Sequence, residues 1–317
     1  MVMSLNRSRS SLNKLKQVLE GQQYRVIGGH SAVKICHWTK ESLRSGRVCY
    51  KELWYPPVES HRCMQMTPYL GCNYQCLHCW RLHSGDRGVK WMEVPFTNRI
   101  DDPEKILTGC IKKRRNLLIG FKGNFYVDRE RFDEALQPSM MTLSLTGEPT
   151  LYPRTGELVE EAWRKGIITF LVTNGSLPER LVEINPLPWQ IYVSVYAPDQ
   201  KTYREIARPK IMNAWERLQE TLKLLPSLET RRVIRLTMIK GYNMKDVLSY
   251  SKMIEIAEPD FVEVKAYEWV GESQNRLPRE AMPWMKEVRE FATEISKHIG
   301  YKVSGEFDPS GVVLLTA

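Results

Sequence analysis

From about residue 64 onward, the chain alternates short segments rich in β-branched residues with segments of helical periodicity, the longest over residues 280–299. Parallel strands need crossover connections, so this alternation favours a parallel sheet covered by helices. The sequence therefore predicts an α/β fold whose sheet is closed or partly closed into a barrel, with Val312–Leu315 adding a strand at one edge. The six expected strands are Met64–Leu70, Met140–Leu145, Thr169–Thr173, Gln190–Tyr196, Val233–Ile239 and Phe261–Tyr267.

A loop with three cysteines follows the first of these strands. Cys72, Cys76 and Cys79 have the spacing C-x3-C-x2-C, and no fourth cysteine lies nearby. Three thiolates on one short loop can hold three corners of a cubane iron–sulfur cluster, which leaves one iron without a protein ligand. A structural zinc site instead needs a closed set of four ligands. The loop favours an open, chemically active cluster; a zinc loop with His78 or His83 as fourth ligand is the alternative.

Size and composition restrict the class of protein. The 317 residues are 42% hydrophobic, which suits a single large α/β barrel. No segment reaches the ~20 apolar residues of a membrane span. Residues 1–16 lack the apolar middle of a signal peptide, so we expect a cytoplasmic protein without membrane association. Seven cysteines, an odd number, then favour metal ligation over disulfides.

A formal net charge of +9 is consistent with a polyanionic partner. Each basic cluster can also be a solvated face, or cations at a helix C-terminus. Tryptophans with basic neighbours can stack on an unpaired base or simply pack against the surface. The basic clusters are Arg7, Arg9, Lys14 and Lys16, then Lys112–Arg115, then Arg231, Arg232 and Arg235, and the tryptophans are Trp91, Trp269 and Trp284.

The cysteine loop resembles the cluster loop of radical S-adenosylmethionine enzymes, with His78 where that family often has an aromatic residue before the last cysteine. In the family, the methionyl amine and carboxylate of S-adenosylmethionine chelate the unique iron of a [4Fe–4S] cluster. An electron from the cluster then splits the sulfonium and gives a 5′-deoxyadenosyl radical. The resemblance implies this cofactor, this cluster and a partial (β/α)6 barrel.

Further segments extend the resemblance. Thr146-Gly147-Glu148-Pro149 is similar to the Gly-Gly-Glu-Pro segment of the family, with Thr146 in place of the first glycine. The resemblance implies that Thr146, Gly147 and Glu148 contact the cationic amine of the cofactor. It implies that Asn174 and Ser194 contact its methionyl and ribose groups. The alternatives are an ordinary strand-to-helix turn and, for Asn174, a plain turn residue before Gly175.

A second group of cysteines precedes the loop. Cys36, Cys49 and Cys63 are 13 and 14 residues apart, which is no zinc signature, and by themselves they can be unrelated buried thiols. Together with the loop, the basic charge and the length, they make the chain resemble the family of tRNA 4-demethylwyosine synthases. That family holds a second [4Fe–4S] cluster on three N-terminal cysteines. Residues 1–63 are then expected to form an N-terminal extension that carries the second cluster, and residues 64–317 the barrel.

The resemblance also implies an activity. Such an enzyme is a lyase of wyosine biosynthesis that condenses N1-methylguanosine at position 37 of tRNA-Phe with pyruvate to give 4-demethylwyosine. Fungal and animal members carry a flavodoxin-like domain; this chain resembles the shorter archaeal form, which needs an external electron donor of flavodoxin or ferredoxin type.

Three residues are candidates for substrate contacts. Lys51, two residues after Cys49, can form a Schiff base with pyruvate or be an exposed lysine. Lys265 and Tyr267, near the end of the sixth strand, can face the substrate. Cys110 shares a helix face with apolar residues and is expected in the core.

Two rival functions remain open from the sequence. One is an activase that makes a glycyl radical on a partner protein, although such chains are usually less basic. The other is a non-enzymatic, zinc-dependent nucleic-acid-binding protein. Metal content separates zinc from iron and sulfide directly.

Overall fold

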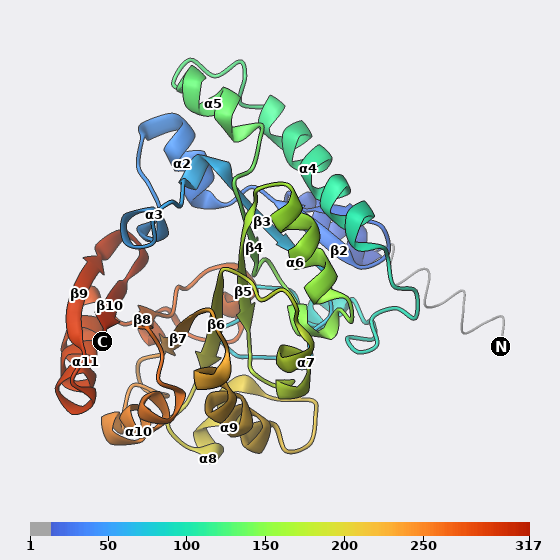
Figure 1. Ribbon diagram of the computed structural model, residues 1–317. Coiled ribbons are helices and arrows are strands. Elements are labelled where there is room, and N and C mark those ends of the chain that lie inside the picture. The colour runs from blue at the N-terminus through green and yellow to red at the C-terminus, as the bar shows by residue number, and fades with distance from the viewer. Residues whose placement is uncertain (1–13) are drawn as a thin grey trace, which may run out of the picture. The chain divides into compact units, whose positions relative to one another are not determined.

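The computed structural model describes residues 14–317, so Arg7 and Arg9 of the first basic cluster lie outside the described residues (Figure 1). The chain divides into two compact units. The first contains the described residues through Cys72, together with His83–Leu171 and Ile184–Pro188. The second contains Asn73–Leu82, Val172–Glu183 and Trp189–Ala317.

The first unit contains a sheet in the order β1-β2-β3-β4-β5. Strand β2 pairs antiparallel with both β1 and β3, and β4 pairs in parallel with both β3 and β5. Every residue of β4 is buried, as expected for a strand covered on both faces. The strands are β1 (Arg25–Ile27), β2 (Ser31–Lys34), β3 (Cys63–Thr67), β4 (Met140–Leu143) and β5 (Ile168–Thr173).

The helices of the first unit connect and cover these strands. The long helix α4 packs beside α6 and against β1 and β2. An apolar cluster that includes Leu43, Leu118 and Phe132 joins α2, α4 and α5. The helices are α2 (His37–Ser45), α3 (Tyr50–Trp54), α4 (Pro103–Ile119), α5 (Arg129–Ala135) and α6 (Thr155–Arg164), with 3-10 turns η1 (Ser60–Arg62), η2 (Asp86–Gly88) and η3 (Pro149–Leu151).

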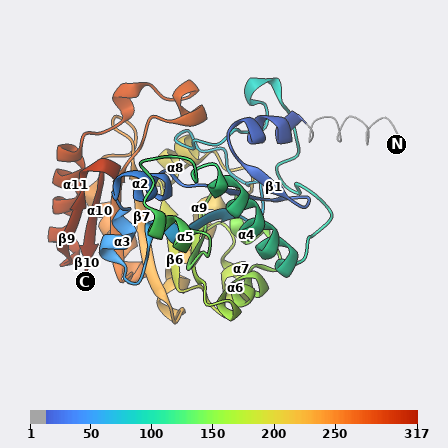
Figure 2. The same cartoon turned by 90° about the horizontal axis from the view of Figure 1, so that it is seen from above.

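The second unit contains a sheet in the order β6-β7-β8-β10-β9, in which β6, β7 and β8 are parallel and the last two strands antiparallel. Helix α11 packs against β8, β9 and β10 and lies beside α10 (Figure 2). The strands are β6 (Gln190–Val195), β7 (Arg231–Met238), β8 (Phe261–Ala266), β9 (Lys302–Phe307) and β10 (Val312–Thr316). The helices are α7 (Pro178–Glu183), α8 (Gln200–Ala207), α9 (Ala214–Leu224), α10 (Val247–Ala257) and α11 (Met285–Ile299), with η4 (Leu225–Ser227), η5 (Gly271–Asn275), η6 (Arg279–Ala281) and η7 (Asp308–Ser310).

The six strands expected from the sequence correspond to β3–β8. The expected strand at Val312–Leu315 is β10 and pairs with β8, but it is not outermost, because β9 covers its other side. The sequence pattern missed β9, since its Lys-Val-Ser-Gly-Glu-Phe segment is largely exposed and interrupted by a glycine. In the part of the chain that the structure describes, no helix is long and apolar enough to cross a membrane.

Candidate active site

The cysteine trio, defined as Cys36, Cys49 and Cys63, belongs entirely to the first unit. Cys36 is the N-cap of α2, Cys49 is the N-cap of α3, and Cys63 is the first residue of β3. The pKa of Cys36 is raised to about 11, chiefly by burial and then by the charge of Cys63. The pKa of Cys49 is raised to about 12, again by burial and then by Cys36. This mutual influence shows that the fold gathers three thiols that are far apart in the sequence.

Other groups around the trio favour the thiolate forms. Backbone amides of Trp38 and Thr39 at the start of α2 lower the pKa of Cys36, and the amide of Lys51 lowers that of Cys49. A bound metal is the usual reason for a buried thiol to ionise, because it shares the negative charge. Three half-buried thiols with amides aimed at two of them therefore fit the donor set of a second iron–sulfur cluster.

Lys51 lies in the first turn of α3, close to the trio. Its ammonium group lowers the pKa of both Cys36 and Cys49. The Nζ atom lies 4.5 Å from the centre of the Phe170 ring, and the residue is half-buried. The position is thus cationic and partly shielded from water, rather than a freely exposed surface site.

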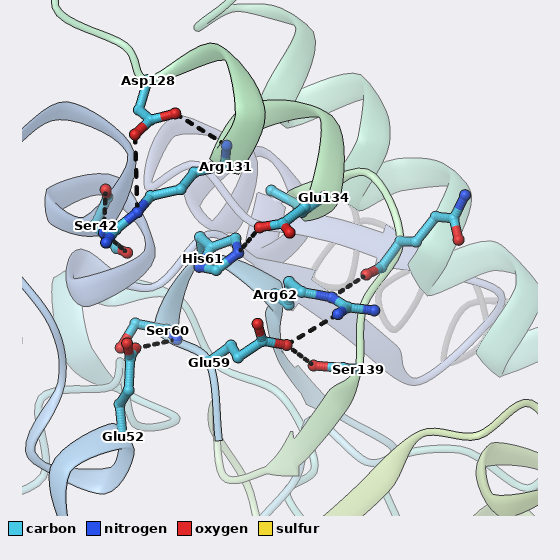
Figure 3. Close-up of polar contacts among 12 residues, drawn as sticks. Ser42, Glu52, Glu59, Ser60, His61, Arg62, Asp128, Arg131, Glu134 and Ser139 are labelled. Atoms are coloured by element: carbon cyan, nitrogen blue, oxygen red, sulfur yellow. Dashed lines mark hydrogen bonds and ion pairs between the residues drawn. The ribbon is translucent and has the colours of Figure 1, made fainter. Parts of the chain in front are cut away.

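A hydrogen-bond network centred on Ser60 joins the three segments that carry the trio cysteines. The amide of Cys49 donates to Ser60 Oγ at 2.8 Å, and the hydroxyl of Thr39 on α2 donates to the Ser60 carbonyl at 2.8 Å. The Ser60 amide donates to Glu52 Oε2 at 2.6 Å, and Cys63 follows three residues later (Figure 3). Ser60 therefore connects the N-terminal starts of α2 and α3 to the start of β3.

The neighbouring residues of Ser60 form a paired polar cluster on the same segment. His61 is buried and its Nε2 lies 2.7 Å from Glu134 Oε2, while Arg62 donates to Glu59 at 2.9 Å (Figure 3). Ligand atoms of Glu59, His61 and Glu134 lie within 4.8 Å of one another. These side chains already pair among themselves and with Arg62, so they fix the segment that leads into Cys63.

The loop cysteines, Cys72, Cys76 and Cys79, begin at the end of a segment of the first unit. Cys72 is buried, and its amide donates to Glu93 Oε2 at 3.2 Å. Gly71 directly precedes Cys72, and its carbonyl accepts from the Glu148 amide at 2.9 Å. Gly147 has φ +73°, and a Cβ atom there would lie 2.0 Å from the Tyr69 carbonyl oxygen. Glycine at this position is required for the backbone to pass so close to the start of the cysteine loop.

Glu148 and Thr146 are held within the same segment. The Glu148 carboxylate is buried and accepts from the amide of Thr150 at 3.1 Å and from its hydroxyl at 2.7 Å. The Thr146 carbonyl accepts from the hydroxyl of Thr67 at 2.5 Å. A buried carboxylate so fixed can receive a cationic amine without rearrangement. The contact to S-adenosylmethionine stays a prediction.

The remainder of the cysteine loop lies in the second unit and is held by both backbone and side-chain hydrogen bonds. The amides of Gln75 and Leu77 donate to the carbonyls of Arg208 and Ile206 at 3.3 and 2.9 Å, and the guanidinium of Arg276 donates to the carbonyl of Cys79. These contacts fix the loop between its cysteines.

His78 lies in that anchored part of the loop. It is half-buried beside the Tyr196 ring, and desolvation followed by the charge of Arg276 lowers its pKa to about 4.

Asn174 and Ser194 also lie in the second unit. The Asn174 side chain donates to Asn73 Oδ1 at 2.9 Å and accepts from the Ser176 amide at 3.0 Å. Asn174 is thereby hydrogen-bonded to the residue that follows Cys72, and its contact to S-adenosylmethionine stays a prediction. Ser194 is buried on β6, in register with Arg235 of β7.

Lys265 and Tyr267 have structural partners in the second unit. Lys265 Nζ pairs with Glu268 and donates to the Ser310 carbonyl at 2.6 Å. Tyr267 is buried in an apolar cluster, and its hydroxyl donates to Ser273 Oγ at 3.0 Å. These contacts account for both residues locally, and their substrate role stays a prediction.

Several side chains of the basic clusters form ion pairs or are buried, so they are not free surface charges. Arg232 pairs with Asp260 and Arg235 with Glu263, so neither offers a free positive charge. Arg114 is fully buried, which contradicts the expectation of a solvated cluster at that position. The signal was present in the sequence, because Arg114 is four residues from both Cys110 and Leu118 and therefore shares their helix face.

Cys110 lies in the core as expected, and burial raises the pKa of its thiol. Trp269 packs into the same apolar cluster as Tyr267, while Trp284 is exposed. Of these two tryptophans, only Trp284 keeps its ring accessible for stacking.

Comparisons with known proteins agree with these features. The Radical SAM superfamily matches residues 66–254, and the family described as Wyosine base formation matches residues 256–317. The fold and the cysteine loop thus define a radical S-adenosylmethionine enzyme, a class that uses a [4Fe–4S] cluster and S-adenosylmethionine.

Relatives at high sequence identity assign the chain to one family within the radical S-adenosylmethionine enzymes. The chain is 48% identical over 299 residues to the S-adenosyl-L-methionine-dependent tRNA 4-demethylwyosine synthase of Pyrococcus abyssi, covering 93% of this chain and 86% of the relative. It is 46% identical to the protein of that name from Pyrococcus horikoshii, covering 95% and 88%. The chain belongs to the tRNA 4-demethylwyosine synthase family.

Solved structures confirm the expected fold class. A structure of TYW1 with a lysine–pyruvate adduct bound matches with a TM-score of 0.85 and 32% identity, covering 96% of this chain and 95% of that chain. The crystal structure of archaeal TYW1 matches with a TM-score of 0.77 and 29% identity, over 96% and 95%. Neither the glycyl-radical activase nor the zinc-binding protein is favoured by these comparisons.

Proposed function

We propose that the chain condenses N1-methylguanosine at position 37 of tRNA-Phe with pyruvate to form 4-demethylwyosine. The names of its Pyrococcus relatives support this activity, and the cysteine loop supports its radical chemistry. Cys72, Cys76 and Cys79 would hold a [4Fe–4S] cluster, which would supply the electron for cleavage of S-adenosylmethionine to a 5′-deoxyadenosyl radical. Thr146, Gly147 and Glu148 are proposed to bind the cofactor amine, with Asn174 and Ser194 on its other groups.

We place pyruvate at the cysteine trio, which would hold a second [4Fe–4S] cluster. The observation that carries this assignment is the position of Lys51, whose cation acts on both Cys36 and Cys49. A matching structure of TYW1 holds a lysine–pyruvate adduct, which supports a lysine in this role. A protonated Lys51 would attract the pyruvate carboxylate, and the neutral amine would condense with the ketone, releasing water.

Borohydride trapping tests this assignment directly. Reduction in the presence of labelled pyruvate should fix the label on Lys51, which peptide mapping identifies. Label on another lysine would move the pyruvate site elsewhere. Absence of any label would leave only the electrostatic role of Lys51.

Binding of tRNA is proposed to be largely electrostatic, because the chain has a net charge of +9. Its affinity for tRNA-Phe should then fall steeply between about 50 and 200 mM salt, since each neutralised phosphate releases counterions. A flat salt dependence would show that the basic charge is incidental. The reducing electron is proposed to come from an external flavodoxin or ferredoxin, and the site of action to be the cytoplasm.

A further inference from the structure

Arg114 is the largest side chain that is fully buried in the described part of the chain, with 1% exposure. It extends from α4 toward the segment that leads into β3. Its Nε donates to the carbonyl of Cys63 at 3.1 Å, and Nη2 donates to the carbonyl of His61 at 2.7 Å. Nη1 donates to the carbonyl of Ala135. All three nitrogens of the guanidinium therefore have partners.

These partners satisfy the hydrogen bonds of Arg114 but not its charge, because carbonyl groups are neutral. Among the described residues, no carboxylate forms a salt bridge with Arg114. An arginine guanidinium stays protonated at neutral pH, so the fold buries a cation here. A buried charge without a counter-charge costs several kcal/mol, on the order of the stability of a small domain.

The guanidinium reaches one trio cysteine directly, because its Nε donates to the carbonyl of Cys63. The fold therefore buries a guanidinium where its natural counter-charge is a metal-bound thiolate.

We propose that Arg114 is a built-in counter-cation for an iron–sulfur cluster held by Cys36, Cys49 and Cys63. The inference rests on the proposed second cluster. Three thiolates outweigh the positive charge of the cluster core, and an added electron makes the group more negative still. The reduction potential of such a cluster depends on net charge, hydrogen bonds and burial. Arg114 stabilises the reduced form most, and by binding the Cys63 carbonyl it also orients that ligand.

The test isolates the trio by replacing Cys72, Cys76 and Cys79 with alanine in every protein compared. In this background, Arg114→Gln removes the charge and Arg114→Lys keeps it without the planar fork. Arg115→Gln is the matched control, because Arg115 lies next on α4 and also donates to a carbonyl, that of Leu136, but is exposed. Iron per chain and an EPR-monitored redox titration are measured after anaerobic reconstitution.

At the midpoint potential of the background protein, Arg114→Gln should lower the ratio of reduced to oxidised cluster at least tenfold. For a one-electron couple this equals a shift of about 59 mV to more negative potential. Arg114→Lys should shift the ratio less, and Arg115→Gln should not shift it. Loss of the cluster in Arg114→Gln but not in Arg114→Lys would also support a charge role.

Two results would overturn the role of Arg114 alone: an unchanged potential in Arg114→Gln, or loss of the cluster in both Arg114 variants, which would assign the effect to hydrogen-bond geometry. A background protein that binds no iron would instead overturn the second cluster itself, and with it this inference.

Discussion

The loop cysteines lie within eight residues of one another, whereas the members of the cysteine trio come from the starts of two helices and a strand. The anchors differ as well. Within the second unit, the cysteine loop is fixed by main-chain hydrogen bonds, such as those of Gln75 and Leu77 to the end of α8, as well as by side chains such as Arg276. The trio is held by side chains, above all Ser60 and Arg114.

This difference predicts which substitutions destabilise each group of cysteines. Backbone anchors survive most substitutions, since any residue except proline supplies an amide. Side-chain anchors are lost with a single substitution, and a buried partner left unpaired adds a further penalty. We therefore expect the change of one supporting side chain to weaken the trio more than the cysteine loop, which also has main-chain anchors.

The largest expected effect is loss of cofactor cleavage in Cys76→Ala. A cluster loop that retains two thiolates loses its hold on the iron, so 5′-deoxyadenosine and methionine should fall to background under strong reductant. Chromatography of both products in an anaerobic assay measures this. Continued cleavage at the parental rate would show that the loop is not the cofactor-cleaving site.

The next effect separates the two groups of cysteines. Replacement of all three trio cysteines by alanine should leave cofactor cleavage intact but abolish the tRNA product, with roughly four irons per chain remaining from one cubane. The reciprocal loop variant should also retain roughly four irons but cleave nothing. Iron analysis and mass spectrometry of digested tRNA report both outcomes. Equal loss of cleavage in both variants would mean that the two sites do not act separately.

A smaller effect is expected for Lys51→Ala. Loss of the amine should reduce kcat/KM for pyruvate at least tenfold, about 1.4 kcal/mol of transition-state stabilisation, while cofactor cleavage stays unchanged. Product formation at limiting pyruvate gives this ratio. Parental rates under those conditions would show that Lys51 has no part in the reaction.

The smallest effect is expected for Ser60→Ala, which leaves the Cys49 amide without its acceptor. Stability should fall by about 1 kcal/mol, and iron bound by the trio should be lost faster to a chelator than in the parent. Iron in the cysteine loop should be unaffected. Ser139→Ala is the control, because the Ser139 hydroxyl donates to Glu59 in the same network but not to Ser60. Identical chelation rates in both variants would argue that Ser60 does not support the trio.

Much of the fold could be predicted because its signals are local. The strands β3–β8 follow from runs of β-branched and apolar residues, which bury both faces of a parallel sheet. The outer strand β9 could not be found, because an exposed edge strand lacks such a run. The cysteine loop and the segment Thr146–Glu148 were also evident, since their chemistry depends on spacing within a few residues.

The sequence by itself determined the class of fold and the class of enzyme, and it predicts Cys72, Cys76 and Cys79 as the ligands of the cysteine loop. Only the tertiary structure decided that Cys36, Cys49 and Cys63 influence one another, that Lys51 lies beside them and that Ser60 joins their segments. It also showed that Arg114, which the sequence suggested to be a surface cation, is buried. The physical reason is range: ligand spacing in a loop is set by adjacent residues, whereas burial and electrostatic coupling depend on elements that meet only when the chain is folded.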